Sequence, residues 1–344
     1  MKHTLDERKQ TILLAITRDY ISTADPVGSR TIARRYELGI SPATIRNEMA
    51  DLEEMGYLEQ PHTSAGRIPS QKGYRFYVDR LMEHERLAEG EQTAIREALE
   101  VKAREIEQVI HQAVRIISDL TSCAAVVLLP EISRGRIHTL RLLPVEPGRA
   151  LLVMISSSGM ITNRILPIPS QVSENDLQWI SGYLTERLKG LTLLDLDEHL
   201  ITAILEELRG YSAFSRQLLE ALVRSVQQAD GGKVITGGAT NILSQPEFRD
   251  IEKARDVISI FERSHDLSQL LFASRPLGVK ITIGNENVLA ELRACSLVSA
   301  VYFVGGLPSG ALGVVGPTRM NYARVISIVE YVARMINDCF DDPF

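Results

Sequence analysis

One stretch near the N-terminus constrains the fold of this chain more than any other. It opens with Ser41 and Pro42. Serine is a preferred helix N-cap, and proline fits the first helical position, where its missing N–H would have no partner anyway. The sequence therefore predicts a helix that starts here. At 100° per residue, Ile45, Met49 and Leu52 fall on one side of that helix and form its expected buried face.

The opposite side of this helix carries side chains that can read DNA bases. These residues are Ser41, Ala43, Thr44, Arg46 and Asn47. Arginine can bond guanine, asparagine can bond adenine, and an alanine or threonine methyl can touch thymine. The helix turns acidic from Glu48 onward, so only its first turns suit a phosphate backbone. An ordinary amphipathic surface helix is the alternative that this segment alone leaves open.

The preceding sequence favours helix-turn-helix organisation. Thr4 and Glu7 form a capping-box pair ahead of an apolar stripe, which predicts a first helix to about Ser22. Ser29 can cap a short second helix, and Gly39 supplies its C-terminal stop. The third helix begins two residues later. Two helices joined by such a tight connection are typical of the motif that places its second helix in a major groove.

A candidate wing follows the third helix. Residues 57–60 alternate as a short strand, and residues 61–66 turn the chain back toward Arg67. Small side chains in the turn allow close backbone approach, and Arg67 could reach a phosphate or a narrow minor groove. A plain surface hairpin is the alternative. The candidate DNA contacts in and after this turn are His62, Thr63, Ser64, Gly66, Arg67, Lys72 and Arg75.

The overall charge indicates that any DNA contact is local. The 344 residues carry a net charge of -6, which is no nucleic-acid signature for the whole chain. Residues 1–80 nevertheless hold 12 Lys/Arg against 11 Asp/Glu, a net of +1. The asymmetry is small, but it has the sign that a DNA-binding segment needs.

Cysteine usage and hydropathy favour a cytoplasmic protein. Cys123, Cys295 and Cys339 are widely separated, without a C-x-x-C pair or a histidine cluster beside them, so we expect reduced thiols and no metal site. The chain goes directly into charged sequence without a signal-peptide pattern. It contains no apolar run near the roughly 20 residues that would span a bilayer, so no membrane contact is expected.

Enzyme signatures are missing from the sequence. No G-x-S-x-G or H-E-x-x-H pattern occurs, and the seven histidines are scattered. Catalytic groups can converge from distant positions, so this lowers the chance of an enzyme without excluding one. We expect a protein that is not an enzyme and needs no cofactor.

The rest of the chain alternates strand and helix patterns. Strand signals occur at residues 123–129, 137–145, 150–156, 160–166, 279–283, 297–304 and 311–315. Helical spacing covers residues 82–120, 173–189 and 319–340. The sequence thus predicts an α+β protein with an antiparallel sheet backed by helices.

Two local patterns have competing interpretations. Apolar residues recur every seven positions at Leu99, Ile106, Ala113 and Leu120, but Lys102 interrupts the seam, which favours packing in the same domain over a coiled coil. The glycines around residues 234–236 do not match a phosphate-binding loop, so a short glycine-flanked strand is the favoured interpretation there.

Long strings at both ends of the chain resemble the family of heat-inducible transcription repressors HrcA. They are Ile40–Met49, Pro61–Arg67, Lys72–Arg75 and Gly316–Ile326. The resemblance covers essentially the full chain, although the part from about 190 to 275 matches more loosely. Gln71 departs from the acidic residue expected at that position.

The resemblance implies an α+β multidomain fold. It implies a winged helix-turn-helix DNA-binding domain at 1–82 and a GAF-like domain whose first part, with a linker helix, covers 83–190. A mostly helical inserted dimerisation domain at 191–275 would then separate this part from the second part of the GAF-like domain, at 276–344.

The resemblance also implies a function. It points to a homodimeric, sequence-specific repressor of chaperone operons that binds an inverted-repeat operator in double-stranded DNA. Repression would be lost on heat shock, and the active fold would depend on the chaperonin GroEL. Two alternatives stay open, a regulator that senses a small molecule through the GAF-like domain, and a structural oligomeriser without DNA binding.

Overall fold

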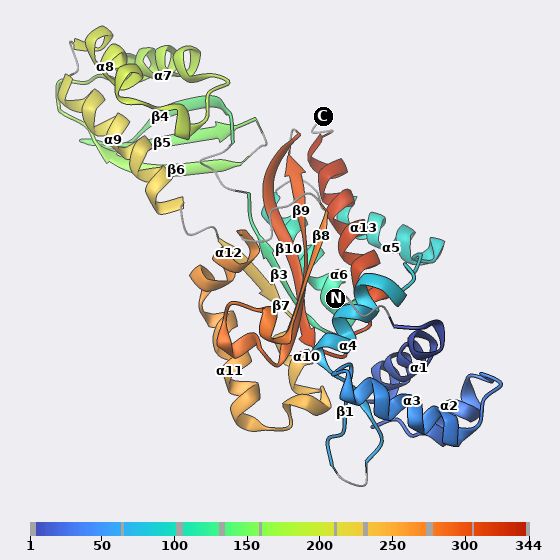
Figure 1. Ribbon diagram of the computed structural model, residues 1–344. Coiled ribbons are helices and arrows are strands. Elements are labelled where there is room, and N and C mark those ends of the chain that lie inside the picture. The colour runs from blue at the N-terminus through green and yellow to red at the C-terminus, as the bar shows by residue number, and fades with distance from the viewer. Residues whose placement is uncertain are drawn as a thin grey trace.

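The computed structural model describes residues 5–62, 65–100, 106–130, 135–157, 160–209, 212–229, 233–272, 278–304 and 306–341. Thr63 and Ser64 of the expected wing, and Thr4 of the expected first cap, lie outside these ranges. Figure 1 shows three parts along one line. We call them the head, which is N-terminal, the body, which contains the largest sheet, and the small domain at the far end.

The head covers residues 5–81. Its elements are α1 (Glu7–Thr23), α2 (Ser29–Arg35), α3 (Pro42–Glu54), β1 (Leu58–Glu59), β2 (Ile68–Pro69), α4 (Gln71–Phe76) and a π-helical turn η1 (Tyr77–Leu81). Strands β1 and β2 pair antiparallel as the base of a hairpin. Ile45, Met49 and Leu52 are buried among side chains of α1 and α2, so the predicted inner face of α3 is confirmed.

Two caps in the head differ from the prediction. Helix α1 starts at Glu7, and its cap is Asp6, whose carboxylate accepts from the backbone N–H of Lys9 at 2.8 Å. Helix α2 is preceded by Gly28, which has no side chain to donate or accept a capping bond, so Ser29 is its first helical residue. Aspartate caps as well as threonine does, and the sequence offers several adjacent candidates.

The body is built on a five-stranded antiparallel sheet in the order β7-β3-β10-β9-β8. The strands are β3 (Ala124–Leu128), β7 (Val234–Gly237), β8 (Val279–Ile283), β9 (Cys295–Val304) and β10 (Leu307–Pro317). Helices α5 (Glu89–Glu100), α6 (Ile106–Thr121) and α13 (Tyr322–Asp341) cover one face. The opposite face carries α10 (Ala239–Leu243), α11 (Ile251–Glu262) and α12 (Ser264–Phe272). Short 3-10 helices lie at η5 (Pro246–Phe248), η6 (Gly284–Glu286) and η7 (Ala290–Leu292).

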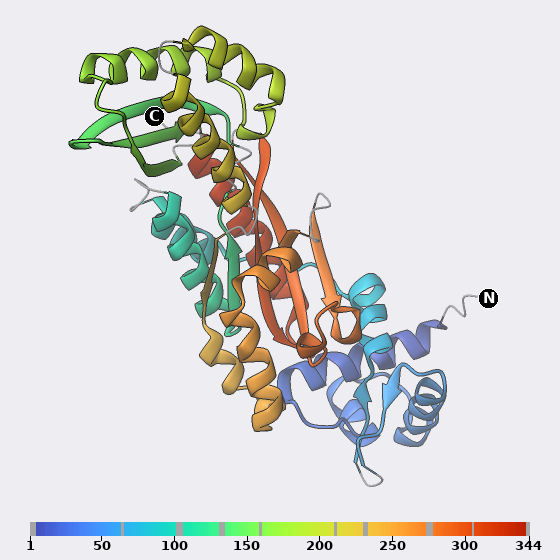
Figure 2. The same cartoon turned by 90° about the vertical axis from the view of Figure 1, so that its left-hand side faces the viewer.

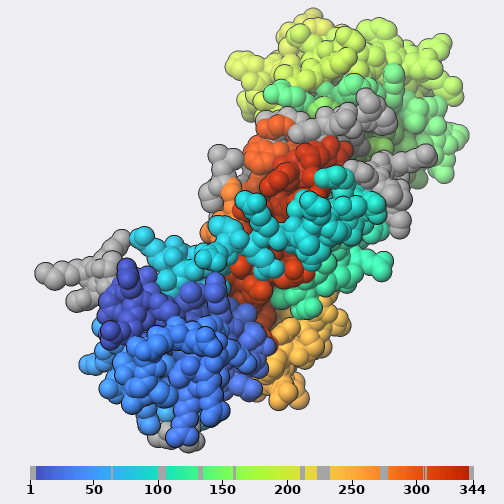
Figure 3. Space-filling view, turned by 90° about the vertical axis from the view of Figure 1, so that its right-hand side faces the viewer, coloured from blue at the N-terminus to red at the C-terminus, as the bar shows by residue number. Residues whose placement is uncertain are grey.

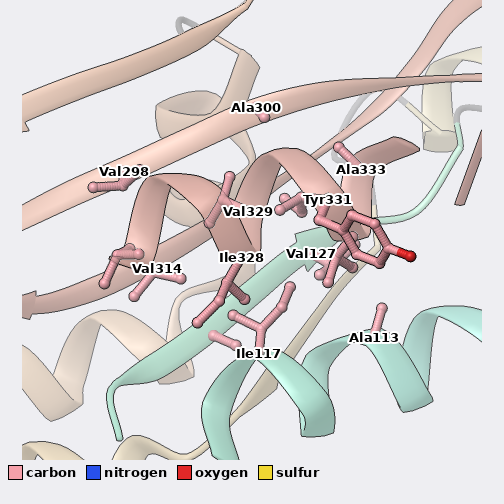
Figure 4. Close-up of a cluster of buried hydrophobic side chains, with 14 of the residues drawn as sticks. Ala113, Ile117, Val127, Val298, Ala300, Val314, Ile328, Val329, Tyr331 and Ala333 are labelled. Atoms are coloured by element: carbon pink, nitrogen blue, oxygen red, sulfur yellow. The ribbon is translucent and has the colours of Figure 1, made fainter. Parts of the chain in front are cut away.

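Helices α6 and α13 pack against the central strands through a continuous apolar cluster. Figure 4 shows the side chains of Ile117 of α6 and Ile328 of α13 approaching each other, with Val127 of β3 beside them in the same cluster. Leu99 and Ala113 are buried in the same cluster, with Ile106 and Leu120 packed against it. The sevenfold apolar repeat therefore serves packing within the chain, as favoured, and residues 234–236 form the expected short strand.

The small domain contains a second sheet. Its strands β4 (Ile137–Glu146), β5 (Arg149–Ser156) and β6 (Ile161–Pro167) pair antiparallel in that order. Helices α7 (Glu174–Leu188), α8 (Glu198–Glu207) and α9 (Ser212–Ala229), with the 3-10 helix η3 (Leu193–Asp195), form one apolar cluster with this sheet. Figure 2 shows α7 and α8 on the far side of the sheet from the body, whereas α9 runs past the sheet toward the body.

The α+β fold class is confirmed. The sheet of the body is assembled from two sequence parts, but the limits of these parts differ from the expectation. Strands β4–β6, expected in the first GAF-like part (83–190), form their own sheet. Strand β7, expected in the insert (191–275), pairs with β3 of the body. The inserted unit is therefore about 135–229. Alternation identifies a strand but not its sheet, which explains the error.

Gly310 allows the side chain of one strand to cross the next. The hydroxyl of Tyr302 in β9 passes β10 and donates to the carbonyl of Leu128 in β3 at 2.7 Å. A Cβ at Gly310 would overlap both that hydroxyl and that carbonyl oxygen. Tyr302 is fully buried, so it cannot move aside into solvent.

We expect Gly310→Ala to destabilise the body by about 1–3 kcal/mol, because an added methyl in a packed core forces neighbours apart. Calorimetric unfolding measures this. The control is Gly90→Ala in α5, where an added Cβ meets nothing within 4 Å, and where the change should be neutral or slightly stabilising. Equal transition temperatures for the two variants would contradict the overlap at Gly310.

Candidate nucleic-acid interface

Helix α3 begins as the sequence predicts. The hydroxyl oxygen of Ser41 accepts from the backbone N–H of Thr44 at 3.1 Å, and Pro42 occupies the first helical position. The N–H of Ile45 donates to the carbonyl of Ser41 at 3.0 Å, which leaves the N–H of Ala43 without an intrahelical partner, and the helix dipole makes this end positive. Such an end attracts the phosphates that border a groove.

The first turns of α3 present the expected reading residues together. Ala43, Arg46 and Asn47 are exposed, and Thr44 is half-buried, with its hydroxyl 2.9 Å from that of Ser41. Within the described residues, Arg46 and Asn47 make no hydrogen bond or ion pair. Their donors are free to bond base edges. Figure 3 shows the head as a separate lobe at one end of the molecule, where a duplex has access to it.

The acidic second half of α3 is neutralised inside the head. The Lys9 ammonium of α1 lies 2.7 Å from Glu48 and 3.1 Å from Asp51. The hydrogen bond to Glu48, and then that to Asp51, raises the pKa of Lys9 well above its ordinary value. Arg8 lies 3.4 Å from Glu48 as well. These cations reduce the repulsion that the acidic residues would exert on phosphates.

Arg67 fixes the wing to the head. Its backbone forms two 2.9 Å hydrogen bonds with Val27, and its guanidinium lies 2.7 Å from Glu53 of α3. Only 20% of the side chain is exposed. A Cβ at Gly66 would overlap the carbonyl of Val27. Gly66 and Arg67 thus have structural roles at the base of the wing. His62 lies nearer the tip of the wing and is exposed.

Lys72 and Arg75 are also engaged within the protein. The Lys72 ammonium donates to the carbonyl of Met55 at 2.7 Å and lies 4.2 Å from the centre of the Tyr57 ring. Arg75 points to the body and bonds Glu286 at 2.9 Å. The structure therefore does not group these two cations with the free guanidinium of Arg46.

Two candidate phosphate contacts were missed by sequence reasoning. Arg30 and Arg34 on α2 are exposed and, within the described part of the chain, make no hydrogen bond or ion pair. Arg35 instead pairs with Asp19. The four-residue spacing of Arg30 and Arg34 on a helix that buries Ile32 was the available signal, since such residues share one face. The first helix of this motif crosses the DNA backbone.

No described part of the chain offers a metal site or a membrane span. Among the described residues, no group of three or more His, Cys, Asp or Glu side chains could hold a metal ion. The helices that the structure describes are too short or too polar to cross a bilayer. Cys123 and Cys295 are buried free thiols, and burial raises the pKa of Cys123 to about 11.

Known proteins resemble the chain over nearly its full length. Residues 107–326 match the family described as "HrcA protein C terminal domain". The heat-inducible transcription repressor HrcA of Pelotomaculum thermopropionicum is 43% identical over 338 residues, which cover 98% of this chain and 97% of the relative. That of Moorella thermoacetica is 44% identical over 338 residues, with 98% of each covered.

A solved crystal structure of a hypothetical protein shares the fold, with a TM-score of 0.66, 23% identity and coverage of 99% of this chain and 100% of that one. This match extends the likeness to all three parts of the molecule. The near-full-length relatives establish the family as well as the fold. The chain belongs to the family of heat-inducible transcription repressors HrcA.

Proposed function

We propose that this protein is a sequence-specific DNA-binding repressor of heat-shock genes that binds an inverted-repeat operator as a homodimer. The observation that carries the proposal is the start of α3, where Arg46 and Asn47 are exposed and have no hydrogen-bond or ion-pair partner among the described residues, on a helix whose other face is buried. Relatives that are named heat-inducible transcription repressors support the same function.

Each part of the head has a distinct task in this proposal. The first turns of α3 enter the major groove, where Ala43, Thr44, Arg46 and Asn47 meet base edges and the Ser41 cap faces a phosphate. Arg30 and Arg34 of α2 contact the flanking phosphates. The wing tip, with His62, Thr63 and Ser64, lies beside the adjacent groove. Gly66, Arg67 and Lys72 hold the wing in place.

Footprinting on the promoters of neighbouring chaperone genes tests the proposal directly. A two-fold dimer on a two-fold operator predicts protection of an inverted repeat. Protection of a single unrepeated site would remove the dimer from the proposal. The absence of any protected site would contradict the function itself.

The two kinds of arginine should have different effects on binding. Arg46→Ala should cost about 1–3 kcal/mol on the operator and relax the base preference at one position of each half-site. Arg34→Ala should weaken binding to all sequences alike and reduce the slope of log affinity against log salt by about 1. Titrations on operator and scrambled duplexes at several salt concentrations measure both effects.

Each variant is the control for the other, because both remove an exposed, unpaired guanidinium from the head. Unchanged operator affinity and specificity for Arg46→Ala would contradict the assigned reading face. A loss of base preference in Arg34→Ala would contradict the phosphate role of α2.

The dimer contact lies on the small domain in this proposal. Its sheet carries α7–α9 on one face, and the opposite face is mainly apolar, with Arg141 and Asn163 beside its central Val153. In register across β4, β5 and β6, this open face presents Leu143, Leu151, Val153, Ile155, Ile161 and Ile165. Ile161 is 63% exposed and Ile165 51%. Apolar patches of this kind mark interaction sites, and a second copy of the same face would cover it.

We expect Val153→Lys to convert the dimer to monomers, since Val153 lies at the centre of the open face, in register with Arg141 and Asn163. Association would bury the new ammonium without a partner, and this cost would oppose formation of the dimer. Sedimentation measures the oligomeric state, and half-site binding should survive. The control is Val288→Lys in the body, where Val288 is 86% exposed. A dimeric Val153→Lys protein would contradict this interface.

Heat release follows from marginal stability. A dimer that is only slightly more stable than its inactive forms dissociates or aggregates after a modest rise in temperature. The exposed apolar face of the small domain would then be a substrate for the chaperonin GroEL, which would return the chain to its active fold.

Operator binding by the purified protein should therefore fall as the temperature enters the heat-shock range, and it should recover when GroEL and ATP are added. Fluorescence anisotropy with a labelled operator follows both steps in one sample. A mutant chaperonin that cannot hydrolyse ATP is the control. Full operator affinity throughout this range without the chaperonin would contradict the proposal.

A further inference from the structure

Two segments that are far apart in the sequence meet between the head and the body. The segment Lys72–Arg75 follows the wing, and Gly316–Tyr322 lies near the C-terminus. Their Tyr74 and Tyr322 rings lie 6.1 Å apart, centre to centre. We call this set of contacts between head and body the joint.

Gln71 makes the first contact of the joint. Its side-chain amide donates to the carbonyl of Ile283 at 2.9 Å, and its oxygen accepts from the N–H of Asn285 at 3.1 Å. Gly284 lies between them with φ +54, and a Cβ there would come within 3.1 Å of the Gln71 oxygen. A glutamine that both donates to and accepts from one turn is fixed in orientation.

Arg75 makes the second contact. Its guanidinium donates to the carbonyl of Ile281 at 2.9 Å and to Glu286 at 2.9 Å. The other Glu286 oxygen accepts from the N–H of Ile283 at 2.9 Å. The two carbonyls bonded by Gln71 and Arg75 lie on β8, at the edge of the five-stranded sheet. The head therefore covers a sheet edge that would otherwise expose backbone groups.

The turn that receives these bonds is itself rigid. The buried amide of Asn287 donates to the carbonyls of Gly284 at 3.0 Å, Leu292 at 3.0 Å and Cys295 at 2.9 Å. The two amide hydrogens of Asn287 are shared among these three carbonyls, and they tie the turn to Leu292 and to Cys295 at the start of β9. A shift of the head at Gln71 or Arg75 therefore has to break bonds rather than bend a loop.

Arg319 makes the third contact, at the other end of the joint. It donates to Glu247 at 2.5 Å, to the side chain of Gln245 at 2.9 Å and to the carbonyl of Ile21 at 3.2 Å, near the end of α1. Its side chain is only 13% exposed. Between these polar contacts, Tyr74 and Tyr77 are buried in the apolar cluster of the body.

We propose that the joint is a positioning device that holds each head at a fixed angle on the body and so sets which half-site spacing the dimer accepts. Gln71, Arg75, Glu286 and Arg319 are positioning residues in this scheme, and Arg75 acts through Glu286 rather than on DNA. The proposal rests on the proposed dimeric operator binding. Two linked heads gain affinity only when both can engage at once.

The test uses the full chain and alters the body side of the joint, away from any DNA contact. Glu286→Arg opposes Arg75 and should release the head at this contact. Exchanging the pair, Arg75→Glu with Glu286→Arg, should restore it. The matched control is Glu291→Arg, because the Arg263–Glu291 pair lies wholly within the body, at 2.5 Å and with similar exposure.

The first measurement is affinity for operators whose half-site spacing is native or longer by five base pairs, which turns one half-site by about half a helical turn. The unaltered protein and Glu291→Arg should lose roughly 100-fold or more on the longer operator. Glu286→Arg should bind the native operator more weakly and lose less than about tenfold on the longer one, with single half-site affinity unchanged. The exchanged pair should recover the spacing preference.

The second measurement is hydrogen exchange without DNA. Amides of residues 279–286 should exchange faster in Glu286→Arg, while those of α13 stay unchanged. Either an unchanged exchange pattern or an unchanged spacing preference in this variant overturns the joint as a positioning device. Tighter binding at every spacing also overturns it, because the joint would then be inhibitory.

The unaltered protein separates this inference from the proposed function. If it binds a single half-site specifically but shows no spacing preference, the inference fails and DNA recognition stands. If it binds no duplex specifically, the proposed function fails, and the inference fails with it.

Discussion

The pairing of β3 with β10 is the interaction on which the rest of the structure depends. Ala124 lies opposite Val315 and Leu128 opposite Ala311, although the two strands are far apart in the sequence. Much of the chain between them leaves the body to form the small domain, and the chain then returns as β7, α10–α12, β8 and β9. Closing so long a loop costs little more entropy than closing a short one, so a whole domain fits between two strands of one sheet.

Local structure was predictable because its causes are local. The Ser41 cap, the Pro42 start and the buried stripe of α3 depend on residues within a few positions, and the strand signals at 279–283 and 150–156 match β8 and β5 closely. The sheet to which a strand belongs depends on long-range pairing. Strands β4–β6 therefore read correctly as strands but were assigned to the wrong domain.

The arginines of the candidate site show the same contrast between local and long-range causes. A guanidinium fits a carboxylate as well as a phosphate, so sequence alone cannot say which one it meets. Arg67 and Arg75 bind Glu53 and Glu286, whereas Arg46 is exposed and has no carboxylate partner among the residues that the structure describes. The acidic partners come from a helix that precedes the wing and from a turn more than 200 residues away. Only the folded chain distinguishes an arginine that is exposed from one that is held by a carboxylate.

The positions of the head and the small domain explain why the joint affects the placement of α3. They lie at opposite ends of the body, as Figure 2 shows, so a dimer formed through the small domains holds its heads far from the contact that joins them. A small rotation at either end then displaces the start of α3 by a distance that grows with the length of the body. Base reading tolerates little misplacement, because bidentate bonds need aligned donors. A repressor built this way needs a rigid body and a rigid joint, and loosening either one would weaken operator binding without changing any residue that touches DNA.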